Sequence, residues 1–338
     1  MVGKTGVLIV NLGTPDSPRV PDVRKYLREF LMDGRVIDFP FIPRWALVNL
    51  IIAPFRAPKS AKIYKELWTE KGSPLKIYGE ANEKQLQTAL GNEYVVKLAM
   101  RYQSPSIVNG LKEFQKMGLN NIIVIPFFPQ YASASTGSVY EEVMRIVTKW
   151  QVIPEIKIKN YFYHYPKFIK AFANNARKHL DKESFEHIVF SYHGLPARQI
   201  RKGDCTGETC KLGSCCDTIH ALNQHCYRAQ CFETTRLLVA ELGLEEGTYT
   251  TCFQSRLGRD PWVQPYTDDV VKDLAEKGIK RVLAFSPAFV ADCLETTIEV
   301  AEEYKEMFEE KGGEHWVLVE SLNDSEAWVD LLVDLVKE

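Results

Sequence analysis

The stretch "HIVFSYHG", His187 to Gly194, decides the fold class of this chain. Its nearly continuous apolar run lacks the alternation of apolar and polar residues that a half-exposed strand shows. Such a run, closed by a glycine, predicts a strand buried on both faces, which is typical of parallel sheets covered by helices.

Similar short apolar runs recur along the chain and alternate with segments of helical spacing. The other predicted strands are Gly6–Gly13, Asn121–Pro129 and Arg281–Val290, and helical segments begin near Val23, Ser106 and Thr267. This alternation predicts an α/β protein with two doubly wound, Rossmann-like domains whose parallel sheets face a cleft. The expected domains are 1–160, completed by 314–338, and 161–313.

Composition limits the partners and the location of the protein. The 338 residues are 45% hydrophobic and carry a formal net charge of -2, with the basic residues spread along the chain. We therefore expect a globular protein that does not bind nucleic acid. We find neither a signal peptide nor about 20 uninterrupted apolar residues, so we expect a cytoplasmic protein without a spanning helix.

One apolar segment does not fit a compact α/β unit. Phe39–Pro58 is interrupted by four prolines, which are Pro40, Pro43, Pro54 and Pro58. The segment is either a buried connection or an exposed apolar flap that covers a ligand or contacts a membrane surface.

His193 lies at the end of the predicted strand that opened this section. Residues just after parallel strands line the ligand site in doubly wound sheets, and a neutral imidazole there can accept a proton near pH 7. A structural histidine is the alternative.

Three acidic residues follow the predicted strand near Phe285 with a spacing of four. Glu295, Glu299 and Glu303 would share one face of a helix. They form either a solvated acidic face or a row of oxygen ligands for a divalent cation.

A proline-rich loop carries side chains suited to a flat aromatic ligand with carboxylates. Arg256, Arg259 and Trp262 could stack on such a ligand or pair with its acidic groups. Arg101 and Tyr102 follow another predicted strand. The chain has no G-x-G-x-x-G, Walker or G-x-S-x-G motif, which argues against nucleotide binding and serine hydrolysis.

Together, these stretches resemble the ferrochelatase family, whose members insert ferrous iron into a porphyrin. The matching motifs, in the family's order, are "LGTPDSP", "REFLMDGRV", "GSPLKIYGE", "FPQYASASTGS", "SYHGLP", "FQSRLGRDPWVQPYT" and "ADCLETTIEVAEE". The resemblance implies two doubly wound domains, with a final helix near 324–336 packed on the first.

The resemblance also implies roles for individual residues. His193 matches the active-site histidine and Glu295 the carboxylate opposite it, while Glu299 and Glu303 would line the path of the Fe²⁺ substrate. Cys293 stands where some relatives carry a second histidine. Porphyrin contacts are implied at Leu12, Arg101, Tyr102, Ser133 and Trp262, with Phe39–Phe55 as an apolar lip over the porphyrin.

Porphyrin metallation itself requires such groups. Two pyrrole protons must leave and Fe²⁺ must lose water, while a planar ring hides both its protons and its lone pairs, so the site must bend the ring. The leading interpretation is a ferrochelatase that acts on protoporphyrin IX. The alternatives are a coproporphyrin III ferrochelatase, a related cobalt chelatase, or a non-catalytic tetrapyrrole or iron carrier.

Six of the eight cysteines lie between Gly203 and Cys231. In a reduced cytosol such clustering favours metal ligands over disulfides. Compared with family members that lack the extra cysteines, this chain has an insertion at about residues 205–226. The insertion resembles those of members that carry a 2Fe-2S cluster, so four of Cys205, Cys210, Cys215, Cys216 and Cys226 would bind it. The adjacent Cys215 and Cys216 are not expected to bind together easily.

Two other interpretations of the cysteines in the insertion are open. A zinc ion could be bound with help from His220 or His225, or the thiols could be free or redox-active. For the whole protein, we expect a monomer or homodimer with peripheral contact to the inner face of the cytoplasmic membrane.

Overall fold

The computed structural model describes residues 3–258 and 260–338. The chain divides into two compact units. Unit 1 comprises Met1–Phe128, Ala132–Tyr161 and Asp324–Glu338, and unit 2 comprises Pro129–Tyr131 and Phe162–Asn323. In the described residues each unit contains one four-stranded parallel sheet, which confirms the predicted α/β fold class.

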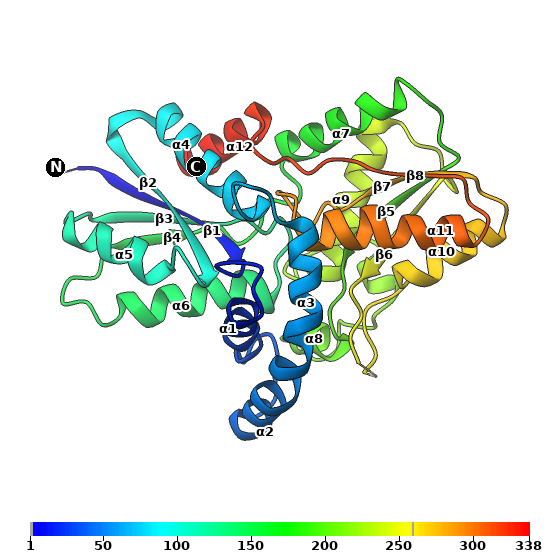
Figure 1. Ribbon diagram of the computed structural model, residues 1–338. Coiled ribbons are helices and arrows are strands. Elements are labelled where there is room, and N and C mark those ends of the chain that lie inside the picture. The colour runs from blue at the N-terminus through cyan, green and yellow to red at the C-terminus, as the bar shows by residue number, and fades with distance from the viewer. Residues whose placement is uncertain (1–2, 259) are drawn as a thin grey trace. The chain divides into compact units, whose positions relative to one another are not determined.

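The sheet of unit 1 has the strand order β2-β1-β3-β4. Helices α4 and α12 lie over one face and α5 and α6 over the other (Figure 1). The strands are β1 (Thr5–Gly13), β2 (Tyr94–Tyr102), β3 (Asn121–Pro126) and β4 (Glu155–Ile158). The helices are α1 (Val20–Leu31), α2 (Phe41–Ala46), η1 (Leu47–Ile52), α3 (Ala53–Leu67), α4 (Pro74–Leu90), η2 (Gly91–Glu93), α5 (Ile107–Lys116), η3 (Ser133–Gly137), α6 (Ser138–Val147) and α12 (Glu326–Lys337).

Helix α5 shows how the sequence sets these elements. The Ser106 side chain caps the helix by accepting a hydrogen bond from the Asn109 backbone N–H. Ile107, Leu111 and Phe114 share one face and are buried in the core of unit 1. Helical spacing and capping therefore direct the apolar face of α5 onto the sheet.

The sheet of unit 2 has the strand order β6-β5-β7-β8. Helices α7 and α9 pack together, and α10 packs with α11 and with β6 (Figure 1). The strands are β5 (His187–His193), β6 (Tyr249–Gln254), β7 (Arg281–Phe285) and β8 (His315–Leu318). The helices are α7 (Pro166–Leu180), α8 (Ala197–Lys202), η4 (Ser214–Cys216), α9 (Tyr227–Leu242), α10 (Thr267–Glu276), η5 (Glu295–Glu303) and α11 (Tyr304–Glu310).

The C-terminal segment differs from the expected domain boundary. Strand β8 pairs with β7, so residues up to Asn323 belong to unit 2 rather than to the first domain. Only the last stretch, with α12, belongs to unit 1. There Trp328 is fully buried, and its ring lies 5.1 Å from that of Phe127.

The apolar segment after residue 39 is helical and exposed, so it is not a buried connection. Helix α2, the π-helix η1 and helix α3 follow one another from Phe41 to Leu67. Pro54 lies where η1 passes into α3, and Pro58 lies inside α3, so neither proline ends the helical run. The exposed apolar side chains are Phe39, Phe41, Ile42, Trp45, Leu50, Ile51 and Phe55. In the described residues, no helix is long and apolar enough to cross a membrane.

Candidate active site

His193 ends β5, and its imidazole is half-buried. Its Nδ1 atom lies 2.7 Å from the carbonyl oxygen of Gly194. A carbonyl can only accept a hydrogen bond, so Nδ1 carries the proton that is donated. In the neutral ring the lone pair is then on Nε2, which is the atom free to accept a proton or to bind a metal.

Gly194 allows Trp262 to lie beside this histidine. A Cβ atom at Gly194 would come within 2.7 Å of the Gln254 carbonyl oxygen and 3.1 Å of the Trp262 ring. The backbone of Val263 donates to Leu195, and that of Ala197 donates to Pro261. These two hydrogen bonds hold the Trp262 loop against the residues that follow β5.

The π-helix η5 carries the three predicted glutamates after β7. Strands β5 and β7 are neighbours and parallel, so the segments that follow their carboxyl ends leave the same edge of the sheet. Glu295 and Glu299 are half-buried and Glu303 is exposed. Glu295 begins η5, and its carbonyl oxygen accepts from the Gln254 side chain at 3.2 Å. π-Helical turns are frequent at functional sites.

Glu299 is held by a set of donors. Its Oε1 atom accepts from the Ser255 backbone N–H at 2.8 Å and from the Tyr304 hydroxyl at 3.0 Å. Its Oε2 atom accepts from the Ser255 hydroxyl at 2.5 Å and from Gln254 at 3.3 Å. Burial, and then the negative charge of Glu299, raise the pKa of Tyr304, which keeps its hydroxyl a donor.

Gln254, at the end of β6, connects these parts of unit 2. It is fully buried, and its side-chain oxygen accepts from Ser191 at 2.8 Å and from Ser286 at 3.3 Å. Its amide nitrogen donates to η5, and its backbone carbonyl accepts from Gly194 at 2.8 Å. One amide side chain thus ties η5 to strand β5 and to the end of β7.

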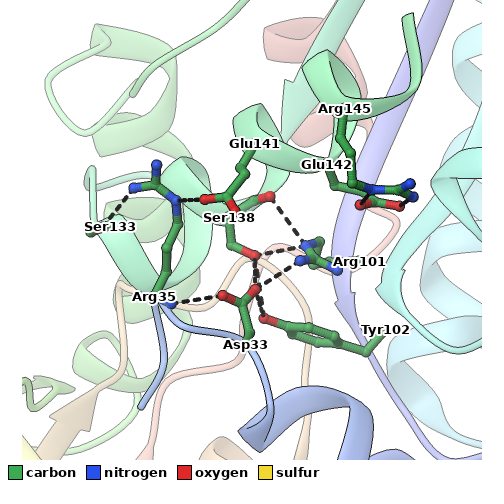
Figure 2. A network of polar contacts seen from close by, with 9 residues as sticks. All are labelled: Asp33, Arg35, Arg101, Tyr102, Ser133, Ser138, Glu141, Glu142 and Arg145. Carbon is green, nitrogen blue, oxygen red and sulfur yellow. Dashed lines mark hydrogen bonds and ion pairs between the residues drawn. The ribbon is translucent and has the colours of Figure 1, made fainter. Parts of the chain in front are cut away.

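In unit 1, a buried carboxylate gathers the polar side chains at the end of β2 (Figure 2). The Asp33 Oδ2 atom accepts from Arg101 at 2.7 Å, from Tyr102 at 2.9 Å and from Ser138 at 2.5 Å. Burial alone would raise the pKa of Asp33, but the hydrogen bonds from Ser138 and the Arg35 backbone, with the Arg101 charge, lower it below its ordinary value. Asp33 is therefore an ionised anchor.

Arg101 and Tyr102 both form hydrogen bonds within this network. The Arg101 guanidinium also donates to the Ser138 hydroxyl at 2.7 Å, and its side chain is 15% exposed. The Tyr102 ring is fully buried, and burial is the main cause that raises its pKa far above the ordinary range. Both side chains hold local structure in unit 1.

Ser133 and Leu12 lie at other points of unit 1. The Ser133 hydroxyl accepts from Arg35 at 3.0 Å, and Arg35 also pairs with Glu141 at 2.5 Å (Figure 2). Leu12 is half-buried near the end of β1. The next residue, Gly13, has φ of 124°, and a Cβ there would lie 2.1 Å from the Tyr102 carbonyl oxygen. Only glycine permits that approach of β1 to β2.

The inserted cysteines differ in burial and in their interactions. Cys215 and Cys216 have their sulfur atoms 3.8 Å apart, and a hydrogen bond from Cys216 is the main cause that lowers the pKa of Cys226. Burial, and then the neighbouring Cys215 and Cys216, raise the pKa of Cys210. Cys205 is exposed. Within the described ranges, no three or more His, Cys, Asp or Glu side chains are arranged to hold a metal ion.

Comparison with known proteins decides the family. The ferrochelatase family model matches residues 4–338. A ferrochelatase of Legionella pneumophila (strain Lens) is 45% identical over 335 residues, covering 99% of each chain. One from Coxiella burnetii (strain Dugway 5J108-111) is 41% identical over 335 residues, covering 99% of this chain and 94% of the other. The chain belongs to the ferrochelatase family.

Membership of the ferrochelatase family confirms the resemblance seen in the sequence. The protein is an enzyme, a lyase that inserts iron into a porphyrin in haem synthesis. Among solved structures, SirB from Bacillus subtilis with Fe3+ has a TM-score of 0.53 at 14% identity, covering 99% of this chain and 95% of that one. SirB of subspecies spizizenii in complex with cobalt has a TM-score of 0.51 at 12% identity, covering 99% and 94%. These two show a shared fold.

Within this ferrochelatase-family chain, each predicted residue can now be placed. Unit 2 contains His193, Trp262 and the glutamates of η5, and unit 1 contains Leu12, Arg101, Tyr102 and Ser133. Arg259 lies outside the described residues. Sequence reasoning singled out neither Asp33 nor Gln254, although both lie inside the quoted motifs. A polar residue that sits between apolar runs in such a motif is the signal that could have found them.

Proposed function

We propose that the protein inserts Fe²⁺ into protoporphyrin IX and releases the two pyrrole protons, with His193 as the proton acceptor. The observation that supports this is the hydrogen bond from Nδ1 to the Gly194 carbonyl, which leaves Nε2 as the basic nitrogen. A base near neutral pH is what removal of a pyrrole proton requires.

The glutamates of η5 receive separate roles in this proposal. Glu295 takes the second proton or holds the metal ion, and Glu303, which is exposed, meets incoming Fe²⁺. Glu299 already accepts four hydrogen bonds, which occupy the capacity of a carboxylate, so it fixes the helix along the metal path.

Porphyrin contacts are proposed in each unit separately. In unit 2, the half-buried indole of Trp262 offers an apolar face beside His193. In unit 1, Leu12 and Ser133 are half-buried and Arg101 retains some exposure, so these three are the proposed contacts. Tyr102 is fully buried, and its proposed part is to hold Asp33 and thereby Arg101.

A metallation assay under anaerobic conditions tests the substrate. Purified protein is given Fe²⁺ or Co²⁺ with protoporphyrin IX or coproporphyrin III, and metalloporphyrin formation is followed by absorbance. We expect the highest kcat/KM with Fe²⁺ and protoporphyrin IX. Faster turnover of coproporphyrin III would assign the protein to that alternative, and porphyrin binding without any metalloporphyrin would identify a carrier.

We further propose a 2Fe-2S cluster bound by Cys210, Cys215, Cys216 and Cys226. Support comes from the interactions among these four thiols, which include the adjacent Cys215 and Cys216, although the sequence did not favour joint binding by that pair. Cys205 is exposed. Four thiolates suit this cluster, and the nearby Arg228 guanidinium would offset part of their negative charge. When bound, the cluster would order a segment that has little apolar surface of its own.

The exposed apolar side chains of α2, η1 and α3 support a proposal of peripheral membrane contact. The apolar lip, Phe39–Phe55, exposes the side chains of Phe39, Phe41, Ile42, Trp45, Leu50, Ile51 and Phe55. Exposed apolar patches mark interaction surfaces, and basic side chains beside them favour anionic lipid. Arg56 and Lys59 lie on the same helix as Phe55 and are exposed. The proposed location is the inner face of the cytoplasmic membrane.

A further inference from the structure

The first turn of α9 joins the cysteine-rich segment to the candidate active site. Cys226 is the N-cap residue of this helix, and Tyr227 and Arg228 are its first two residues. All three belong to unit 2, as do His193 and the Trp262 loop. The contacts of Tyr227 and Arg228 therefore connect parts of a single unit.

Tyr227 holds the backbone of His193. Its ring is buried, and its hydroxyl donates to the His193 carbonyl oxygen at 2.7 Å. The imidazole of His193 is itself held by the next carbonyl, that of Gly194. Because Tyr227 fixes the peptide unit between these two residues, it restricts the direction in which Nε2 points.

Arg228 holds two loops at once. Its Nη1 atom donates to the Gly213 carbonyl at 3.2 Å, inside the cysteine-rich segment. Its Nε and Nη2 atoms lie 3.4 and 3.3 Å from the Gln264 carbonyl, two residues after Trp262. The guanidinium also lies over the Phe232 ring, 4.4 Å from its centre, which fixes the side chain on α9.

We propose that Tyr227 and Arg228 are positioning residues. Through them, a change in the order of the cysteine-rich segment alters the positions of His193 and the Trp262 loop. Loosening of the segment would displace the first turn of α9 and, with it, both carbonyl contacts. The inference rests on the proposed function only in giving His193 a part in catalysis. The link between the two loops is a property of unit 2 itself.

Removal of one hydroxyl tests the link to His193. Tyr227→Phe keeps the buried ring and loses the hydroxyl that bonds the His193 carbonyl, so we expect kcat to fall about 3- to 10-fold with little change in the KM for porphyrin. Tyr192→Phe is the matched control. Its hydroxyl is also buried and bonds Thr235 at 3.0 Å rather than the His193 backbone, so its kcat should not change. An unchanged kcat for Tyr227→Phe, or equal losses in both variants, would overturn the positioning role.

Hydrogen exchange tests the link between the loops without any activity measurement. Arg228→Gln should raise deuterium uptake in peptides from both 205–226 and 255–266, while uptake in β5 stays low. Arg236→Gln is the control, because this residue of α9 pairs with Glu233 at 2.5 Å and, in the described residues, its guanidinium bonds to neither loop. A rise in 205–226 alone would contradict transmission.

A variant within the cysteine-rich segment then tests the direction of the effect. Cys216→Ser should raise uptake at 255–266 when Arg228 is present and should add little in the Arg228→Gln background. Equal rises in both backgrounds would show that Arg228 does not carry the effect. If the wild-type protein forms no metalloporphyrin, the proposed function fails, but the exchange result still decides this inference.

Discussion

Asp33 illustrates how one buried carboxylate organises its neighbours. Its side chain is 6% exposed, and it accepts hydrogen bonds from Arg101, Tyr102 and Ser138. A buried ion pair adds little net stability compared with an apolar packing, but removal of one partner leaves the other charge unpaired. The network therefore makes Arg101 depend on Asp33.

Asp33→Asn should lower the free energy of unfolding at pH 7 by about 3–5 kcal/mol, because Arg101 loses its counter-charge. The lowered pKa of Asp33 means that its contribution is complete above about pH 4 and is lost as the pH falls through the native pKa. The difference between variant and wild type should therefore shrink in acid. Urea unfolding from pH 7 to pH 3 measures this.

The control for Asp33 is an exposed ion pair in the same unit. Asp16 pairs with Lys25 at 3.0 Å, and both side chains are well exposed. Asp16→Asn should lower the free energy of unfolding by less than about 1 kcal/mol. If Asp33→Asn were no more destabilising than Asp16→Asn, the buried network would contribute no more to stability than an exposed ion pair.

Glu299→Gln should lower the free energy of unfolding by about 1–3 kcal/mol, because the amide cannot accept from all the donors that now surround the carboxylate. The exposed Glu302 on the same helix is the matched control, and Glu302→Gln should leave stability unchanged. Chemical denaturation of both variants makes the comparison. Equal stability would mean that the donors around Glu299 find other partners.

Sequence patterns predicted that His193 ends a buried strand but missed the burial of Asp33, for a physical reason. The position of His193 follows from strand order, since a residue at the end of a buried parallel strand must reach the ligand edge. The burial of Asp33 depends on side chains that are far away in the sequence, such as Ser138. No local pattern records that contact.

At the scale of elements, the sequence predicts where the cysteine-rich segment and the apolar lip lie, but not the conformation of either segment. The crowding of cysteines is visible in the sequence, but the exposure of Cys205 depends on the path of the chain. The lip was predicted to be interrupted by its prolines, yet it is helical. Pro58 lies inside α3, so the tertiary context of the segment overrides the low helix propensity of proline.

Serine substitutions test the proposed cluster. Anaerobically purified protein should be reddish brown, and Cys210→Ser, Cys216→Ser or Cys226→Ser should reduce its visible absorption and its content of iron and sulfide. Cys205→Ser should retain both, because this thiol is exposed and is not among the proposed ligands. Cys252→Ser should also retain them, because Cys252 is buried in the core of unit 2. One zinc ion and no sulfide would contradict the cluster.

Flotation with liposomes tests the apolar lip. Phe41→Ser, Ile42→Ser and Phe55→Ser together remove three of its exposed side chains and should abolish binding to anionic vesicles. Val152→Ser with Ile153→Ser is the matched control, because these residues of unit 1 are 76% and 56% exposed but lie outside the lip. Equal flotation of the two variants would show that the lip does not bind lipid.

At the scale of the whole molecule, the two sheets follow from the sequence more directly than the site does. Continuous apolar runs fix the strands, and short right-handed crossovers leave few ways to order them. The boundary near the C-terminus was placed too early, because β8 is only four residues long and moderately buried. A strand this short gives little periodic signal, so its pairing with β7 could not be foreseen.

The central claim is that this member of the ferrochelatase family acts through the imidazole of His193. The most direct measurement compares wild type and His193→Ala for anaerobic insertion of Fe²⁺ into protoporphyrin IX, with porphyrin binding followed by fluorescence quenching. His179→Ala is the control, because that histidine pairs with Glu320 outside the site. We predict a loss of about 100-fold or more in kcat for His193→Ala with porphyrin affinity retained, since the missing group handles protons. A His193→Ala variant that turns over at the wild-type rate would contradict the account.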